Sequence, residues 1–236
     1  KLDFIINNRM SVAGAQNKIL LNYNEENKTY FIPNYLEATT HILKPEVKSN
    51  TLYPLATINE YYCMRLAKKI GLNIPNIYLD FINEPVYLIE RFARYKKDNI
   101  IYRLPVKDAT QVLNIGKENK YYDASIDNLL LFLENVDLLK ITAKEQLAKW
   151  LIYNFIIGNC DNHLKNISLI YSQDSYDCQL APYYDLLSTA IYNSPLYNNS
   201  MSLDIKAWQQ SQLTIALNEK IFIMYIKYND LYIIGQ

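Results

Sequence analysis

The sequence predicts an α+β protein with a β-rich first part and a mostly helical second part. Short β-prone runs separated by turn-forming residues occupy residues 1–94, whereas longer runs with helical periodicity dominate residues 95–236. A chain of 236 residues can bury one core or two smaller lobes. We place the boundary between two lobes near Tyr95–Ile101, a charged stretch that we expect to be exposed.

The first part contains five predicted strands and one main helix. Lys18–Tyr23 and Lys28–Ile32 flank the polar turn Asn24–Asn27, a pattern typical of a β-hairpin. The helix ends at Gly71, which favours the left-handed conformation found after helices. The other three strands are Thr39–Leu43, Ile77–Ile82 and Val86–Phe92, the helix is Pro54–Ile70, and its apolar face is Ile58, Tyr62, Leu66 and Ile70.

The second part contains three predicted helices and two short strands before a tail that we expect to be partly helical. Thr142 and Glu145 form a capping-box pattern ahead of a strongly apolar run, so this helix should supply the core of the second part. The helices are Lys107–Ile115, Ser125–Asn135 and Thr142–Ile157, the strands are Ile167–Tyr171 and Cys178–Leu180, and the tail is Ser202–Gln236.

The composition disfavours several classes of protein. Lys and Arg together number 24, as do Asp and Glu, so the zero net charge does not favour direct nucleic-acid binding. Three cysteines without a close pair and only two histidines argue against a disulfide framework and a zinc site, and they fit a reducing cytoplasm. The sequence has no apolar run of membrane-spanning length and no visible signal peptide, so we expect no membrane association.

The segment Asn159–Asn166 reads N-C-D-N-H-L-K-N and places Asp161 five positions ahead of Asn166. Phosphoryl transfer uses a carboxylate to accept the proton of an attacking hydroxyl and an amide oxygen to hold magnesium, and protein-kinase catalytic loops have this D-x-x-x-x-N spacing. The structural alternative is a polar turn after a helix that ends at Gly158. We expect His163 to brace the loop rather than to act as a base.

Two charged residues elsewhere suit the same chemistry. Asp185 follows a predicted strand, in the order expected for a metal-binding carboxylate downstream of a catalytic loop. Lys44 ends an apolar strand, and in phosphotransferases a lysine in such a position contacts the nucleotide phosphates. Glu60 on the next helix could pair with Lys44, as the helix glutamate does in protein kinases. The structural alternatives are a helix N-cap for Asp185 and a surface position for Lys44.

The segment Ser11–Lys18 reads S-V-A-G-A-Q-N-K, and its small residues would let backbone N–H groups approach phosphates. It has one glycine, Gly14, and is neither a G-x-G-x-x-G loop nor a Walker A loop. A flexible turn is the structural alternative.

Six segments in this order resemble the HipA family of serine/threonine kinases from bacterial toxin–antitoxin modules. They span most of the chain and read S-V-A-G-A-Q-N-K (11–18), T-H-I-L-K-P (40–45), N-E-Y-Y-C-M-R-L-A-K-K-I-G-L (59–72), Y-L-I-E-R-F-A-R (87–94), G-N-C-D-N-H-L-K-N (158–166) and L-A-P-Y-Y-D-L-L (180–187).

The resemblance implies a two-lobed, protein-kinase-like fold and the cofactors ATP and Mg²⁺. It implies that Asp161 is catalytic, that Asn166 and Asp185 hold the metal, and that Ser11 is autophosphorylated, which switches the enzyme off. A phosphate on Ser11 would be repelled by the phosphates of the nucleotide. The implied ATP contacts are Lys44, the hinge residues Glu90 and Phe92, the pair Asp108 and Gln111 beyond the hinge, and the loop residues Gly14, Ala15, Gln16 and Lys18.

The chain departs from the family pattern in two places. Ala93 stands where the hinge motif R-F-D-R usually has aspartate. Only residues 1–10 precede the Gly14 loop, which resembles the short split-toxin form called HipT, whose missing subdomain is a separate small protein. A trimmed chain would have the same layout.

The resemblance implies a kinase toxin that phosphorylates a protein, with aminoacyl-tRNA synthetases as the family's targets, and so inhibits translation. The implied partners are a HipB-like DNA-binding antitoxin or a HipS-like small subunit. One alternative is a nucleotide-binding pseudokinase that binds an antitoxin, and another is a small-molecule or lipid kinase of the same fold. Intact Lys44, Asp161, Asn166 and Asp185 argue against the pseudokinase.

Overall fold

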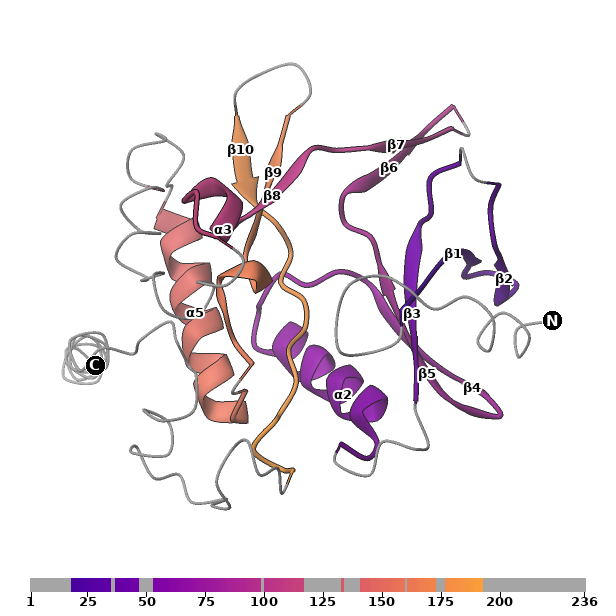
Figure 1. The fold of residues 1–236 in the computed structure, drawn as a ribbon, viewed down its shortest axis with the longest axis horizontal. Coiled ribbons are helices and arrows are strands. Elements are labelled where there is room, and N and C mark those ends of the chain that lie inside the picture. Colours follow the sequence, from indigo (N-terminus) through magenta and orange to yellow (C-terminus); the bar gives the residue numbers. More distant parts are fainter. Residues whose placement is uncertain are drawn as a thin grey trace.

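A computed structural model describes residues 18–34, 37–46, 53–98, 100–116, 133, 141–159, 161–172 and 177–192. The candidate residues Ser11, Gly14, Ala15 and Gln16 lie outside this part of the chain, as do most of the predicted helix Ser125–Asn135 and the whole predicted tail helix region. Strands and helices in the described part are mixed as the α+β prediction requires (Figure 1).

Five antiparallel strands form the first sheet, in the order β2-β1-β3-β5-β4. The predicted hairpin is confirmed, and a second tight turn at Asn83, whose φ is 60°, joins the last two strands. The strands are β1 (Ile19–Asn24), β2 (Thr29–Phe31), β3 (His41–Pro45), β4 (Ile77–Ile82) and β5 (Glu84–Glu90).

The second part contributes a hairpin, a small sheet and the longest helix. Strands β6 and β7 pair with each other, and the small sheet has the order β10-β9-β8. The predicted boundary stretch near Tyr95–Ile101 is therefore a hairpin. These elements are β6 (Arg94–Lys97), β7 (Ile100–Arg103), β8 (Val106–Asp108), α3 (Ala109–Val112), α5 (Ile141–Ile157), the 3₁₀ helix η2 (Leu164–Asn166), β9 (Ser168–Tyr171) and β10 (Cys178–Leu180).

Helix α2 (Ala56–Lys69) forms where predicted but presents a different face to the core. The predicted face is wrong, because Tyr62, Leu66 and Ile70 are 61 %, 49 % and 47 % exposed. The buried positions are Thr57, Glu60, Met64 and Ala67, which also repeat with helical spacing. This orientation brings the Glu60 carboxylate under the sheet while Met64 and Ala67 pack into the core.

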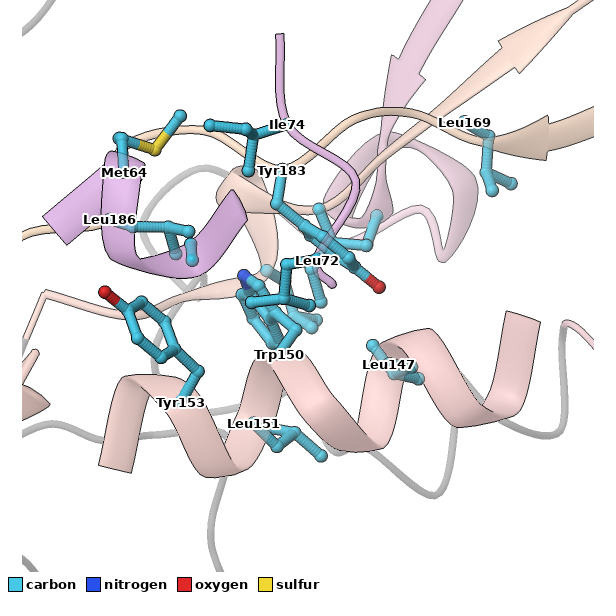
Figure 2. Close-up of a cluster of buried hydrophobic side chains, with 14 of the residues drawn as sticks. Met64, Leu72, Ile74, Leu147, Trp150, Leu151, Tyr153, Leu169, Tyr183 and Leu186 are labelled. Carbon is cyan, nitrogen blue, oxygen red and sulfur yellow. The ribbon is translucent and has the colours of Figure 1, made fainter. Parts of the chain in front are cut away.

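Helix α5 supplies the centre of the main core, as its apolar sequence predicts. Trp150 is fully buried, and its ring stacks on Tyr183 with centroids 5.6 Å apart (Figure 2). The Tyr153 hydroxyl donates a hydrogen bond of 2.5 Å to the Cys63 carbonyl, which joins α5 to α2. Removing a buried aromatic side chain of this size typically costs about 3–5 kcal/mol.

The main core contains residues from both sides of the predicted lobe boundary at residue 94. Met64 and Tyr87 belong to the same cluster of buried side chains as Leu147 and Trp150. A second, smaller cluster lies on the other face of the first sheet, around Leu43 and Leu88. The division into lobes 1–94 and 95–236 stays a prediction.

The start of α5 differs from the prediction. Helix α5 begins at Ile141, so Thr142 lies inside the first turn rather than at the predicted cap, and Glu145 pairs with Lys149 at 2.8 Å.

Within the described residues, no helix has the length and apolar character needed to cross a membrane.

Both main helices end at a glycine. Gly71 (φ 84°) and Gly158 (φ 66°) have left-handed backbones, and the N–H of the residue after each one bonds back to a carbonyl five residues earlier. The two glycines differ in the room around them. A Cβ at Gly71 would meet nothing within 4 Å, whereas one at Gly158 would lie 2.4 Å from the Ala190 Cβ. Gly158 therefore allows the segment after Asp185 to pack on the end of α5.

We expect Gly158→Ala to lower the free energy of unfolding by about 2–4 kcal/mol, because it adds the Ala190 clash to the cost of a left-handed alanine. The matched control Gly71→Ala carries only the backbone cost, about 1–2 kcal/mol. Urea denaturation of both variants measures the difference. If both variants lost the same free energy of unfolding, the segment at Ala190 would have moved away without destabilising the fold, and the predicted clash would be wrong.

Candidate phosphoryl-transfer site

Lys44 is buried between two carboxylates from distant parts of the chain. Alternation along β3 points Ile42 and Lys44 to the face that α2 covers. The Lys44 Nζ atom lies 2.6 Å from Glu60 Oε1 of α2 and 2.5 Å from Asp185 Oδ1 in the segment after β10. The Glu60 pairing anticipated from the sequence is confirmed, and Asp185 joins it.

The three charges determine one another's ionisation. Burial alone would lower the pKa of Lys44, but the carboxylates of Asp185 and Glu60 hold it above its ordinary value. Burial alone would raise the pKa of Asp185, but the Lys44 ammonium and the nearby charge of Lys18 hold it well below its ordinary range. Lys44 and Asp185 are therefore both ionised at neutral pH. Lys18 immediately precedes β1 and its charge acts on Asp185, whereas its contact with a nucleotide phosphate stays a prediction.

The loop after α5 is held by a buried amide that the sequence analysis missed. Asn159 Nδ2 donates to Asn154 Oδ1 (2.8 Å) and to the Asp185 carbonyl (3.4 Å). Asn159 Oδ1 accepts a hydrogen bond of 3.1 Å from the Asp161 N–H. Asn159 thus fixes Asp161 relative to both α5 and Asp185. The sequence signal was Asn154, an amide inside an otherwise apolar helical run.

Asp161 and Asn166 lie at opposite ends of one short loop and differ in exposure. Asp161 has a side chain 52 % exposed, so a hydroxyl from outside can reach it. Asn166 is buried, and its Nδ2 donates to the Asp161 carbonyl at 3.1 Å, so the amide oxygen is the atom available for the predicted metal contact. His163 Nε2 lies 3.7 Å from Asp161 Oδ1, beyond hydrogen-bonding distance for this pair, and the bracing role of His163 stays a prediction.

Phe92 of the predicted hinge reaches the catalytic loop through Tyr184, a second residue that the sequence analysis missed. The two rings stack with centroids 5.6 Å apart. The Tyr184 hydroxyl donates to the Lys165 carbonyl (2.8 Å) and lies 2.7 Å from Ser168 Oγ. Glu90 is held by Asn76, whose Nδ2 donates to Glu90 Oε2 at 2.8 Å. Tyr184 immediately precedes Asp185, so it ties that carboxylate to the hinge.

Asp108 and Gln111 form the cap of α3. Asp108 Oδ1 accepts from the Gln111 N–H at 3.0 Å, and Gln111 Oε1 accepts from the Asp108 N–H at 2.9 Å. Asp108 Oδ2 also lies 3.2 Å from Lys165 Nζ in the catalytic loop. Asp108 therefore contacts that loop, and the predicted contact of Asp108 and Gln111 with the nucleotide stays a prediction.

The donors at this site suit Mg²⁺. Among the described residues no three His, Cys, Asp or Glu side chains gather to hold a metal unaided. Magnesium in phosphotransferases needs only one or two protein oxygens, because phosphates and water complete its shell. The Asp185 carboxylate and the Asn166 amide are such oxygens, so the residues fit the metal.

The ionised state of Asp185 predicts a pH dependence of stability. Its pKa is lower in the folded than in the unfolded chain, so its contribution is complete above the unfolded pKa of about 4 and is lost as pH falls through the folded value. We expect Asp185→Asn to cost about 1.5–3 kcal/mol at neutral pH, with the difference from wild type shrinking toward about pH 3. Chemical denaturation at several pH values measures this.

Asp98→Asn is the matched control, because Asp98 is exposed in the β6–β7 turn, where Asn tolerates the same left-handed backbone. Parallel pH profiles for wild type and Asp185→Asn would contradict an ionised Asp185 held by Lys44.

The chain is similar to proteins named as kinases. Y4mE of Sinorhizobium fredii, a proposed kinase, is 35 % identical over 189 residues, covering 78 % of this chain and 43 % of Y4mE. The serine/threonine-protein kinase toxin HipA of Shewanella oneidensis is 29 % identical over 212 residues, covering 83 % of this chain and 47 % of HipA. The chain thus spans less than half the length of either relative.

Two solved structures share its fold. HipA of Shewanella oneidensis, solved in a complex with HipB and operator DNA, matches with a TM-score of 0.64 at 28 % identity, over 78 % of this chain and 45 % of HipA. The proinflammatory kinase CtkA of Helicobacter pylori matches with a TM-score of 0.51 at 18 % identity, over 76 % of this chain and 56 % of CtkA, which concerns the fold alone.

These matches confirm the kinase-like α+β fold, while the HipT-like layout stays a prediction. The family described as "HipA-like C-terminal domain" matches residues 10–228. Because this match covers most of the sequence, the chain belongs to the HipA-like C-terminal domain family.

Proposed function

We propose that this chain is the catalytic part of a serine/threonine protein kinase of the HipA type, which transfers the γ-phosphoryl group of ATP to a protein hydroxyl. The observation that carries the proposal is the buried contact of Lys44 with both Glu60 and Asp185, 2.6 and 2.5 Å away. Phosphoryl transfer needs a fixed cation for the phosphates and a carboxylate for the metal at one place.

Each residue has a role that follows from its position. Glu60 orients Lys44 toward the phosphates, and Asp185 and Asn166 hold Mg²⁺. When bound, Mg²⁺ neutralises charge that develops on the phosphates. The exposed Asp161 accepts the proton as the substrate oxygen bonds to the γ-phosphorus and the bond to ADP breaks. Asn159 holds the backbone of Asp161, and Tyr184 holds the segment that carries Asp185.

The biological role proposed for this activity is that of a toxin. The support is family membership together with the HipA of Shewanella oneidensis, which is named a kinase toxin and was solved with HipB. We propose an antitoxin partner and a protein target, with an aminoacyl-tRNA synthetase as the first target to test. Phosphorylation of Ser11 would inhibit the enzyme by placing a dianion beside the nucleotide phosphates.

Asp161→Asn should lower kcat for phosphoryl transfer by about 10²–10⁴-fold, because it removes the proton acceptor and keeps the side-chain shape. Labelled ATP and Mg²⁺, with wild type and variant side by side, measure transfer to the chain and to candidate synthetases. Asp98→Asn should label like wild type. Undiminished labelling of Asp161→Asn would refute the catalytic role, and ATP binding without any transfer by wild type would favour the pseudokinase.

Ser11→Ala should abolish autolabelling while leaving phosphorylation of an added substrate intact or increased, since the inhibitory phosphate cannot form. Mass spectrometry of the wild-type product locates the label. A phosphate found at another residue, with Ser11 unmodified, would overturn the proposed self-inhibition.

A further inference from the structure

A cavity of about 370 Å³ lies behind the predicted hinge, where the first hairpin meets the β6–β7 hairpin. None of the residues assigned to phosphoryl transfer lines it. Three arginines, Arg91, Arg94 and Arg103, supply its charge. The rest of its lining is apolar Leu20, Ile32 and Pro33, and polar Asn34, Glu37 and Thr39.

The three guanidinium groups are held close to one another. Arg94 and Arg103 are directly opposite in the β6–β7 register, an arrangement in which like charges destabilise a strand pair. Burial and then the positive charges of Arg94 and Arg103 lower the pKa of Arg91 to about 10. An anion beside Arg91 and Arg94 would offset this repulsion.

Neutral oxygens position two of the arginines. Arg91 Nη1 donates to Thr39 Oγ1, while Arg94 donates from Nε to the Thr39 carbonyl (3.1 Å) and from Nη1 to the Ala93 carbonyl (2.8 Å). In the described part of the chain neither Arg91 nor Arg94 pairs with a carboxylate. Glu37, the carboxylate among the described lining residues, is exposed and accepts from the Asn34 N–H at 3.3 Å. The site is thus pre-organised with donors to spare.

We propose that this cavity binds a phosphoryl group, supplied either as free phosphate or on an organic body. Arginine forks match phosphate oxygens in pairs, and a phosphomonoester carries about −1.5 to −2 charge, enough to offset two or more of the cations. The apolar side of the cavity, formed by Leu20, Ile32 and Pro33, has room for an organic body beside the phosphate. This proposal does not depend on the proposed kinase activity.

Isothermal titration of the Ser11→Ala, Asp161→Asn double variant tests the site, because this protein can neither label itself nor turn over ligand. The probes are inorganic phosphate, O-phosphoserine and phenyl phosphate, without ATP or Mg²⁺. Saturable binding of at least one probe is expected. Equal affinity for inorganic phosphate identifies free phosphate as the source, and tighter binding of an organic probe identifies a phosphorylated body.

Arg94→Gln should weaken that binding at least 10-fold, and Arg94→Lys, which keeps the charge without the fork, should fall between. Arg65→Gln is the control for loss of one positive charge, since Arg65 is exposed on α2 beside the Tyr61 ring. Without ligand, Arg94→Gln should be as stable as the parent or more stable, because it removes repulsion. Equal binding by Arg94→Gln and Arg65→Gln, or no saturable binding of any probe, overturns the proposal.

Discussion

The buried ion pairs of Lys44 hold together three elements that are far apart in the sequence. Strand β3 carries the ammonium, α2 carries Glu60, and the segment after β10 carries Asp185, which is 141 residues from Lys44. Because Lys44 has two carboxylate partners, removing Asp185 leaves Glu60 to compensate its charge, which is why the expected cost is moderate. The orientation of α2 follows from this constraint, because only one face can deliver Glu60 to Lys44.

Neutral polar contacts hold the loop 159–166, which is the proposed catalytic loop, in a fixed position relative to Asp185. Asn159 connects the end of α5 to Asp161 and to the Asp185 backbone, and Tyr184 connects Phe92 to the carbonyl of Lys165. Both residues use neutral hydrogen bonds and stacking, so they hold the loop without pairing with the charged groups of Lys44, Asp161 or Asp185. Asn159 and Tyr184 thereby hold the backbone of Asp161 and Asp185, while the Asp161 side chain stays accessible.

The arginine cavity shows the opposite use of charge. Lys44 has two carboxylates at hydrogen-bonding distance, whereas the partners of Arg91 and Arg94 among the described residues are oxygens of Thr39 and Ala93. Lys44 therefore has its charge compensated within the protein, whereas Arg91 and Arg94 face the cavity in which we propose an anion. Arg91 and Arg94 line the cavity, and Phe92 between them stacks on Tyr184, the neighbour of Asp185.

Local sequence by itself determined most strands and helices, because alternation, helical periodicity and the glycines at positions 71 and 158 act over a few residues. It also marked Lys44, Asp161, Asn166 and Asp185 as chemically suited, and Glu60 as the partner of Lys44. It did not determine which face of α2 is buried, since Ile58, Tyr62 and Leu66 repeat with the same period as Glu60, Met64 and Ala67. Only the tertiary structure decided which face of α2 is buried. It also decided the roles of Asn159 and Tyr184 and brought Arg91, Arg94 and Arg103 to one cavity. Each of these depends on contacts between different segments of the chain, and such contacts leave no pattern in the local sequence.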